Sequence, residues 1–165
     1  MKKHCFLVFL LCSFFWVSAH SQTLAPQLVR KLNPTFSSFP FGFTNYNGAM
    51  YFFATRDELL KDNISFWKSD GTEQGTQLVK DDVGFLTAGV LPRIEVLNNQ
   101  MVFLTRASIG DSLFLQLWKS DGTEAGTGIL KKAGRDYSAG ADNATGELTP
   151  FNGKLYFNFY ETGGG

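Results

Sequence analysis

One polar, glycine-rich phrase occurs twice in the chain, and this repetition limits the folds that the chain can adopt. FWKSDGTEQGT runs from Phe66 to Thr76, and LWKSDGTEAGT runs from Leu117 to Thr127, 51 residues further along. A catalytic loop is normally present once, whereas a phrase that recurs at a fixed spacing indicates a repeated structural unit. We therefore expect a chain built from tandem copies of one supersecondary unit.

Two further phrases recur in the same order around the first. They are LVRKLNP at Leu28, LVKDDVG at Leu78 and ILKKAG at Ile129, and YNGAMYFFA at Tyr46, LNNQMVFLT at Leu97 and FNGKLYFNF at Phe151. These spacings predict a β-repeat region at 28–165, divided into units at 28–77, 78–128 and 129–165. The third unit stops before its own Trp-Lys-Ser-Asp-Gly-Thr, so we expect a fragment of a longer repeat protein.

Short asparagine-containing dipeptides in these phrases predict hairpin turns. They are Asn47-Gly48, Asn98-Asn99 and Asn152-Gly153, and each lies between two apolar runs. Asn and Gly tolerate the positive φ that two-residue hairpin turns require. Each unit should therefore contain at least one β-hairpin.

The runs after these turns alternate in a way that predicts buried strands. Met50 and Phe52 point to one face, and Tyr51 and Phe53 point to the other. Both faces are largely apolar, which favours strands that are covered on both sides. A sheet stacked between neighbouring sheets fits this pattern better than a sheet with one face in water.

The repeated polar phrase predicts a second connection between strands, which we call the corner. Its residues are Trp67, Ser69, Asp70, Gly71, Thr72 and Gly75 in the first copy, and Trp118, Ser120, Asp121, Gly122, Thr123 and Gly126 in the second. Asp-Gly is a tight hairpin-turn dipeptide, and the last glycine of each copy should allow a second positive φ. The Ser, Asp and Thr side chains should bond nearby backbone N–H groups, and each Trp should anchor its corner in the core.

These elements together predict an all-β chain. A unit of about 50 residues with three to four strands has the size of one propeller blade. Fewer than three such units cannot close the usual ring of four to eight blades, so we expect an incomplete β-propeller-like array. An open β-solenoid or a sheet stack is the alternative architecture.

The N-terminus has the pattern of a secretory signal peptide. Lys2 and Lys3 precede an apolar run from Cys5 to Val17, and small residues follow up to Ser21. This predicts a signal peptide at 1–21, followed by a mature N-terminal segment at 22–27. No transmembrane segment is expected after cleavage, and the mature protein should be secreted, extracellular or held on the outer cell surface.

Cleavage would change which chemistry the chain can support. Both cysteines and both histidines lie within the first 21 residues, so His-dependent triads, Cys nucleophiles and the usual zinc sites are excluded from the mature chain. Its net charge is about −2, because two lysines leave a balanced set of 15 basic and 15 acidic residues. No basic stripe suggests nucleic acid as a partner.

No cofactor is expected, although calcium is an open alternative. Asp70 with Glu73, and Asp121 with Glu124, offer oxygen ligands beside glycines. Their spacing differs from that of an EF-hand loop, so calcium would act there only as a stabilising ion. The acidic segment from Asp136 to Glu147 offers a similar set of oxygens in a loop.

The corner and hairpin phrases resemble the ELWxxDGT repeat family. These ELWKSDGTEAGT-type repeats, sometimes labelled hyalin-like, occur in long secreted proteins of Bacteroidota and other bacteria. The resemblance covers nearly all of 28–165, with Ser65-Phe66 and Gln116 as mild departures where Glu-Leu and Glu are usual. It implies a propeller-like fold, and it implies no catalytic residues because none are established for the family.

Two classes of function remain open from the sequence. The first is a structural or interaction module, without catalysis, that binds an unknown extracellular glycan or protein. The alternative is a part of a propeller-type glycan-processing enzyme, which needs two carboxylates across the scissile bond. The candidate carboxylates are Asp57, Glu58, Asp81, Asp82, Glu95, Asp136, Asp142 and Glu147, and nothing in their spacing selects a pair.

Overall fold

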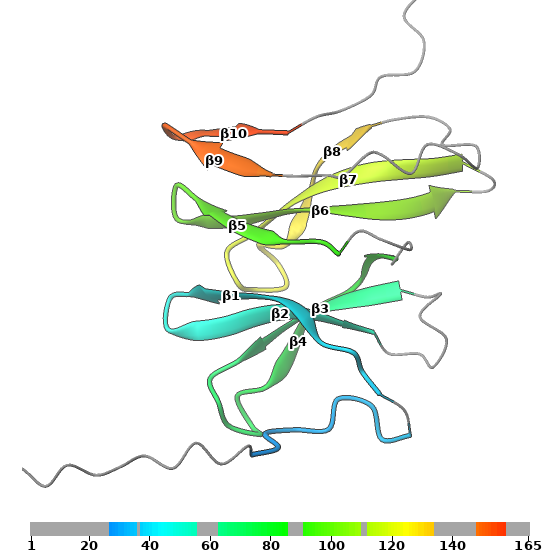
Figure 1. Ribbon diagram of the computed structural model, residues 1–165, viewed down its shortest axis with the longest axis vertical. Helices are drawn as coiled ribbons and strands as arrows, with labels where there is room; N and C mark the ends of the chain where they lie inside the picture. Colours follow the sequence, from blue (N-terminus) through cyan, green and yellow to red (C-terminus); the bar gives the residue numbers. More distant parts are fainter. Residues whose placement is uncertain are drawn as a thin grey trace, which may run out of the picture.

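The computed structural model describes residues 27–35, 37–55, 63–85, 91–109, 112–133 and 148–157, and all regular secondary structure there is β-strand (Figure 1). The expectation of an all-β chain is thus confirmed for these residues. In this part of the chain, no helix is long and apolar enough to span a bilayer. The signal peptide at 1–21 and the acidic segment at 136–147 lie outside the described residues.

The strands form three successive layers. The first layer holds β1 (Phe41–Tyr46), β2 (Ala49–Thr55), β3 (Asn63–Ser69) and β4 (Gln77–Phe85). The second layer holds β5 (Ile94–Leu97), β6 (Gln100–Ile109), β7 (Ser112–Ser120) and β8 (Gly128–Ala133). The third layer holds β9 (Thr149–Phe151) and β10 (Lys154–Tyr156).

Strands within each layer pair antiparallel in chain order, so each of the first two layers is a meander. The ladders of the first and second layers meet at one residue pair in the described chain, Phe85 of β4 with Arg106 of β6. Figure 1 shows the layers stacked one above another, with β1–β4 below, β5–β8 in the middle and β9–β10 above. The sheet does not close on itself in this part of the chain.

The first two layers pair the same positions of the repeated sequence. Phe52 lies opposite Trp67 in the first layer, and Phe103 lies opposite Trp118 in the second. A register shift occurs next to each tryptophan where it pairs with the fourth strand. We call residues that lie 51 positions apart in the first and second layers counterparts.

The hairpin turns have the backbone geometry of type I′ turns, because both central residues have positive φ. The φ angles are 48° and 77° at Asn47 and Gly48, 48° and 57° at Asn98 and Asn99, and 48° and 71° at Asn152 and Gly153. These turns join β1 to β2, β5 to β6 and β9 to β10. They set the pairing register of each hairpin, and so decide which residues face the neighbouring layer.

The largest apolar core lies between the first and second layers. Phe53 and Phe66 from the first layer and Phe103 from the second are fully buried there. The Phe103 ring centroid lies 5.1 Å from that of Phe53 and 5.0 Å from that of Phe66. Trp118 stacks on the same Phe103 ring at 6.0 Å. The layers are therefore held together mainly by aromatic side chains and not by backbone hydrogen bonds.

The opposite face of the second layer is also covered. Leu104 and Leu117 form a buried cluster there, and Leu155 and Phe157 from the end of the chain pack against it. The second layer is thus enclosed on both faces, as the apolar character of its strands predicts.

The outer face of the first layer is covered only in part. Phe52, Ala54 and Trp67 form a small buried cluster on this face, and Leu32 from the N-terminal segment packs against it. The segment from Leu28 is irregular although its sequence resembles that of β4 and β8. Those two strands pair with β3 and β7, whereas the described residues place no such strand beside Leu28, so its backbone has no ladder to join.

Candidate binding surface

The corner of the first layer is a longer loop than its sequence suggests. β3 ends at Ser69 and β4 begins at Gln77, so residues 70–76 make the connection. Thr76 N–H donates to the carbonyl of Thr72 at 3.1 Å, which closes one wide turn. The expectation of a tight Asp-Gly hairpin turn is therefore wrong for this corner and for its counterpart at 121–127, where β7 and β8 are joined in the same way.

The polar side chains of the first corner bond to the corner itself. The Ser69 and Thr76 hydroxyls are 2.7 Å apart, and Ser69 Oγ accepts the N–H of Gly71 at 3.1 Å. Asp70 Oδ1 accepts the N–H of Thr72 at 2.9 Å and its hydroxyl at 2.7 Å. These bonds satisfy backbone N–H groups that the loop leaves without a ladder partner.

The second corner makes the same bonds. Ser120 and Thr127 hydroxyls are 2.7 Å apart, and Ser120 Oγ accepts the N–H of Gly122 at 3.0 Å. Asp121 Oδ1 accepts the N–H and the hydroxyl of Thr123 at 2.9 Å and 2.7 Å. The residues that define the phrase thus have a structural use in both copies.

Glycine has two different uses in each corner. Gly71 and Gly122 have φ of 90° and 91°, a backbone conformation that residues with a side chain rarely adopt. Gly75 and Gly126 do not have positive φ, so the expectation of a left-handed backbone there is wrong. A Cβ on Gly75 would lie 1.9 Å from Asp70 Oδ1, and the last glycine is needed because the aspartate occupies that space.

The two aspartates are held as carboxylates by their own loops. Hydrogen bonds from the Thr72 hydroxyl and N–H keep the pKa of Asp70 below its ordinary value of 3.8, and Thr123 does the same to the pKa of Asp121. Within the described residues, no three His, Cys, Asp or Glu side chains gather as metal ligands.

Replacing both aspartates should flatten the acid side of the stability profile. A pKa lowered by folding stabilises the folded state above 3.8, and this contribution is lost as the pH falls through the lowered pKa. In the Asp70→Asn/Asp121→Asn variant, the free energy of unfolding should fall less steeply below pH 4 than in the parent. Urea unfolding at a series of pH values measures this slope. The parent protein, unfolded over the same pH series, is the reference, and equal slopes for the two proteins would contradict the prediction.

The two corner tryptophans are core residues and not exposed stacking platforms. Trp67 is 8 % exposed and Trp118 is 6 % exposed. Trp118 Nε1 donates to the Thr105 hydroxyl at 2.9 Å, and that hydroxyl donates to the carbonyl of Val83 at 2.5 Å. The counterpart of Thr105 is Ala54, and Trp67 Nε1 is the one buried side-chain nitrogen or oxygen in the described chain without a hydrogen-bond partner.

Thr105 has a role that the sequence does not reveal. Comparison of the units shows Thr at 105 where the first unit has Ala54, but the sequence does not show which groups the hydroxyl joins. In the fold it links the second-layer tryptophan to a carbonyl of the first layer. The Thr105 hydroxyl thus makes hydrogen bonds that join the two layers across the main core.

Thr105→Val should lower the free energy of unfolding by about 2–4 kcal/mol, since each buried polar group left unpaired costs roughly 1–3 kcal/mol. Valine keeps the shape of threonine, so the loss reports on the hydroxyl bonds to Trp118 and Val83. Chemical denaturation followed by tryptophan fluorescence measures it. Thr149→Val, at an exposed position of β9, should change the free energy by less than about 0.5 kcal/mol.

Three of the candidate carboxylates of an enzyme lie on strands of the described chain. Asp81 accepts a hydrogen bond from the Ser65 hydroxyl at 2.6 Å, and Asp82 sits at a positive φ of 49° in β4. Glu95 lies on β5 of the second layer. The remaining candidates, Asp57, Glu58, Asp136, Asp142 and Glu147, lie outside the described residues.

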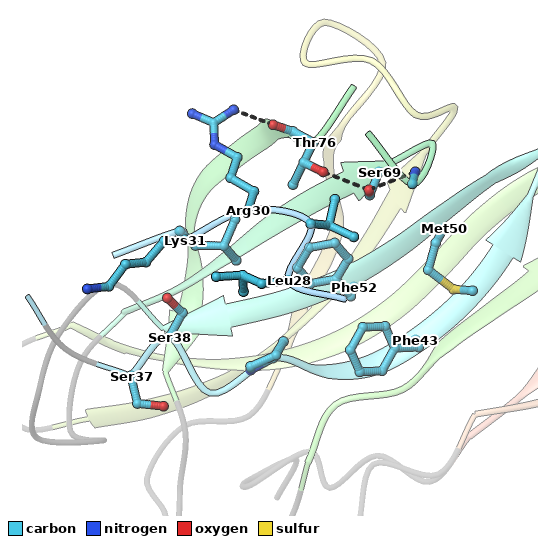
Figure 2. A pocket seen from close by; sticks show the side chains of 14 residues that line it. Leu28, Arg30, Lys31, Ser37, Ser38, Phe43, Met50, Phe52, Ser69 and Thr76 are labelled. Carbon is cyan, nitrogen blue, oxygen red and sulfur yellow. Dashed lines mark hydrogen bonds between the residues drawn. The ribbon is translucent and has the colours of Figure 1, made fainter. Parts of the chain in front are cut away.

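A groove of about 550 Å³ lies on the outer face of the first layer (Figure 2). Phe43, Met50 and Phe52 line its floor, and the phenyl rings of Phe43 and Phe52 stack at 5.4 Å. The N-terminal segment, from Leu28 onward, forms one wall of the groove. The groove has a volume typical of sites that bind small molecules or protein side chains, and its lining is mainly apolar.

The N-terminal wall of the groove is fixed to the first corner. Arg30 Nη1 donates to the carbonyl of Thr76 at 2.6 Å, as Figure 2 shows, and to that of Glu73 at 3.4 Å. Further along the segment, the carbonyl of Ser38 accepts the N–H of Thr55 at 2.8 Å. The N-terminal wall is thus anchored at two points, and we take the groove as the candidate binding surface.

Comparison with known proteins gives no family assignment for this fold. The likeness to ELWxxDGT repeats therefore stays a prediction from the two corners and the hairpin phrases. No protein-family model, curated protein or solved structure matches the chain.

Proposed function

We propose that the protein is a secreted or cell-surface repeat protein of the ELWxxDGT type that acts as a structural and interaction module. The observation that carries this proposal is the identity of the hydrogen bonds in the two corners. These bonds direct the polar groups of the phrase into the loop. The most strongly repeated residues therefore build the scaffold, which leaves the layer faces and the groove for contacts with other molecules.

The arrangement of the layers supports a propeller-like array. Each of the first two layers is a four-stranded antiparallel meander, which is the form of a propeller blade. The first strands of successive layers lie side by side, with β1 next to β5 and β5 next to β9. In a propeller, the first strands of the blades line up in this way around the central axis.

The proposed location can be tested by the fate of the N-terminus. The full chain, carrying a C-terminal tag, should be recovered outside the cytoplasm of a Gram-negative host with Gln22 as its first residue. N-terminal sequencing of the recovered protein measures the cut. An uncut chain that stays in the cytoplasm would contradict the proposal.

The proposed interaction role can be tested on the same mature protein. Immobilised protein should retain a polysaccharide or an extracellular surface protein from a defined panel, and Phe43→Ser should weaken retention if the groove is the binding surface. Phe43 is more than half exposed, so this substitution should leave the fold intact. Turnover of chromogenic glycosides that is abolished by replacing one carboxylate would instead support the enzyme alternative.

A further inference from the structure

Counterpart residues on corresponding faces of the first two layers differ in exposure. Phe43 is 57 % exposed, whereas its counterpart Ile94 is 5 % exposed, and Met50 is 41 % exposed, whereas its counterpart Met101 is fully buried. Met50 and Met101 have the same place in their hairpins, opposite Asn45 and Val96, whereas Phe43 lies at a register shift that the second hairpin lacks. The difference between the two methionines therefore comes from what lies on top of each layer.

The first layer itself covers this face of the second layer. The Tyr51 side chain reaches to Gly122, where an added Cβ would lie only 2.2 Å from the Tyr51 hydroxyl oxygen. Burial raises the pKa of the Tyr51 hydroxyl, as expected for a phenol that is enclosed between layers. The counterpart of Gly122 is Gly71, which lines the groove and has nothing within 4 Å of an added Cβ.

The third layer, at the other end of the stack, carries aromatic residues equivalent to those with which the first layer covers the second. The third-layer hairpin holds Phe151 and Tyr156 at the places that Tyr46 and Tyr51 take in the first layer, relative to the Asn-Gly turn. Tyr46 and Tyr51 are each 6 % exposed, whereas Phe151 and Tyr156 are 61 % and 51 % exposed. The ring centroids are 5.9 Å apart in the buried pair and 6.3 Å apart in the exposed pair.

The exposed pair points away from the rest of the stack. Leu155 and Phe157 pack against the second layer, and successive side chains of a strand alternate between its faces. Tyr156 lies between them in sequence and so faces outward, on the same side as Phe151. One end of the molecule thus presents an aromatic pair, and the other end presents the groove.

We propose that a second copy of this chain docks head to tail on the first, with Phe151 and Tyr156 of one copy seated in the groove of the next. Tyr156 then lies over Gly71, as Tyr51 lies over Gly122 within one chain. The groove volume of about 550 Å³ leaves room for the two rings beside Met50 and Phe43. The two surfaces differ, so the contact is heterologous, and it generates either open rows of copies or a closed ring.

Complementary variants test this contact directly. Sedimentation velocity of the mature protein should show association beyond a dimer as the concentration rises toward about 1 mM, the weak end of specific binding. Met50→Glu and Tyr156→Glu each place a charge in the contact and should weaken association at least tenfold. Both positions are exposed, so circular dichroism should show parental folding.

Mixing the two variants separates head-to-tail docking from other modes of association. Each variant keeps one intact end, so an equimolar mixture should form a dimer that does not grow further. Met50→Lys mixed with Tyr156→Glu should instead associate beyond this dimer, because the two altered surfaces then carry opposite charges and attract each other. Leu130→Glu, on the exposed surface of the edge strand β8, is the matched control and should associate like the parent.

A photo-crosslinking residue in place of Tyr156 gives an independent readout. In a mixture of isotopically labelled and unlabelled chains, it should crosslink to the peptide that contains Phe43, Met50 or Gly71 of another copy. A parent protein that is monomeric at every concentration, a mixture that stays monomeric, or equal weakening by Leu130→Glu would each overturn the proposal. These measurements use purified protein alone, so their outcome is independent of the secretion and ligand-binding experiments above.

Discussion

Phe103→Ala should lower the free energy of unfolding by about 3–5 kcal/mol, the usual cost of deleting a buried phenyl ring. Phe103 is fully buried and contacts Phe53, Phe66 and Trp118, so its ring joins the first layer to the second. Small domains are stable by only about 5–15 kcal/mol, and the loss is therefore a large share of the total. Urea unfolding followed by circular dichroism measures the change.

Phe151→Ala is the matched control for this prediction. Phe151 is 61 % exposed on the third layer, so its removal from a monomer should change the free energy by less than about 0.5 kcal/mol. The comparison is made at protein concentrations low enough to keep each variant monomeric. Equal small effects for both substitutions would mean that the layers are not packed on Phe103 as described.

Gly84→Ala should destabilise the fold by about 2–5 kcal/mol, through backbone strain and overpacking together. Gly84 lies in β4 with φ of 148°, a conformation that alanine adopts only under strain. An added Cβ would lie 2.5 Å from the carbonyl oxygen of Arg106 and 2.7 Å from Thr105 Cβ. Neither group can move without separating β4 from β6 next to the residue pair that joins the two ladders.

Gly128→Ala provides the control for Gly84→Ala in a comparable strand position. Gly128 begins β8, has no positive φ, and has nothing within 4 Å of an added Cβ. Its replacement by alanine should be neutral or slightly stabilising, because alanine restricts the unfolded chain more than glycine does. Thermal unfolding of the two variants compares them directly, and similar melting temperatures would argue against close packing of β4 on β6.

Local elements of the fold could be predicted from the sequence because their determinants are local. The alternation after Asn47-Gly48 marks β2 as a strand that is apolar on both faces, and Tyr51 and Phe53 are indeed buried. The residues of the corner phrase belong at a connection between strands, because Ser, Asp and Thr bond to nearby N–H groups. Such patterns act over a few residues, so one sequence is enough to read them.

Other features of the fold depend on contacts between residues far apart in the chain, and the sequence does not indicate these contacts. The sequence shows that Gly75 is special, but not that the Asp70 carboxylate occupies its Cβ space. Gly84 is an unremarkable strand glycine until Arg106 is placed beside it. The groove could not be foreseen either, because counterpart residues such as Met50 and Met101 look alike in sequence and differ only in what covers them.

In the described chain the ladders of the first two layers meet at one residue pair, Phe85 with Arg106, and this has a consequence for how such a gene can change. Because each layer completes its own hydrogen-bond ladder, insertion or deletion of one whole unit by recombination leaves the ladders of the other layers intact. The main strand contacts of the described residues lie within a layer or between adjacent layers, so the sequence separation of contacting residues should stay constant as units are added. Tandem duplication can therefore lengthen the array without slowing the folding of any one layer, provided that each new layer carries an aromatic face for its neighbour.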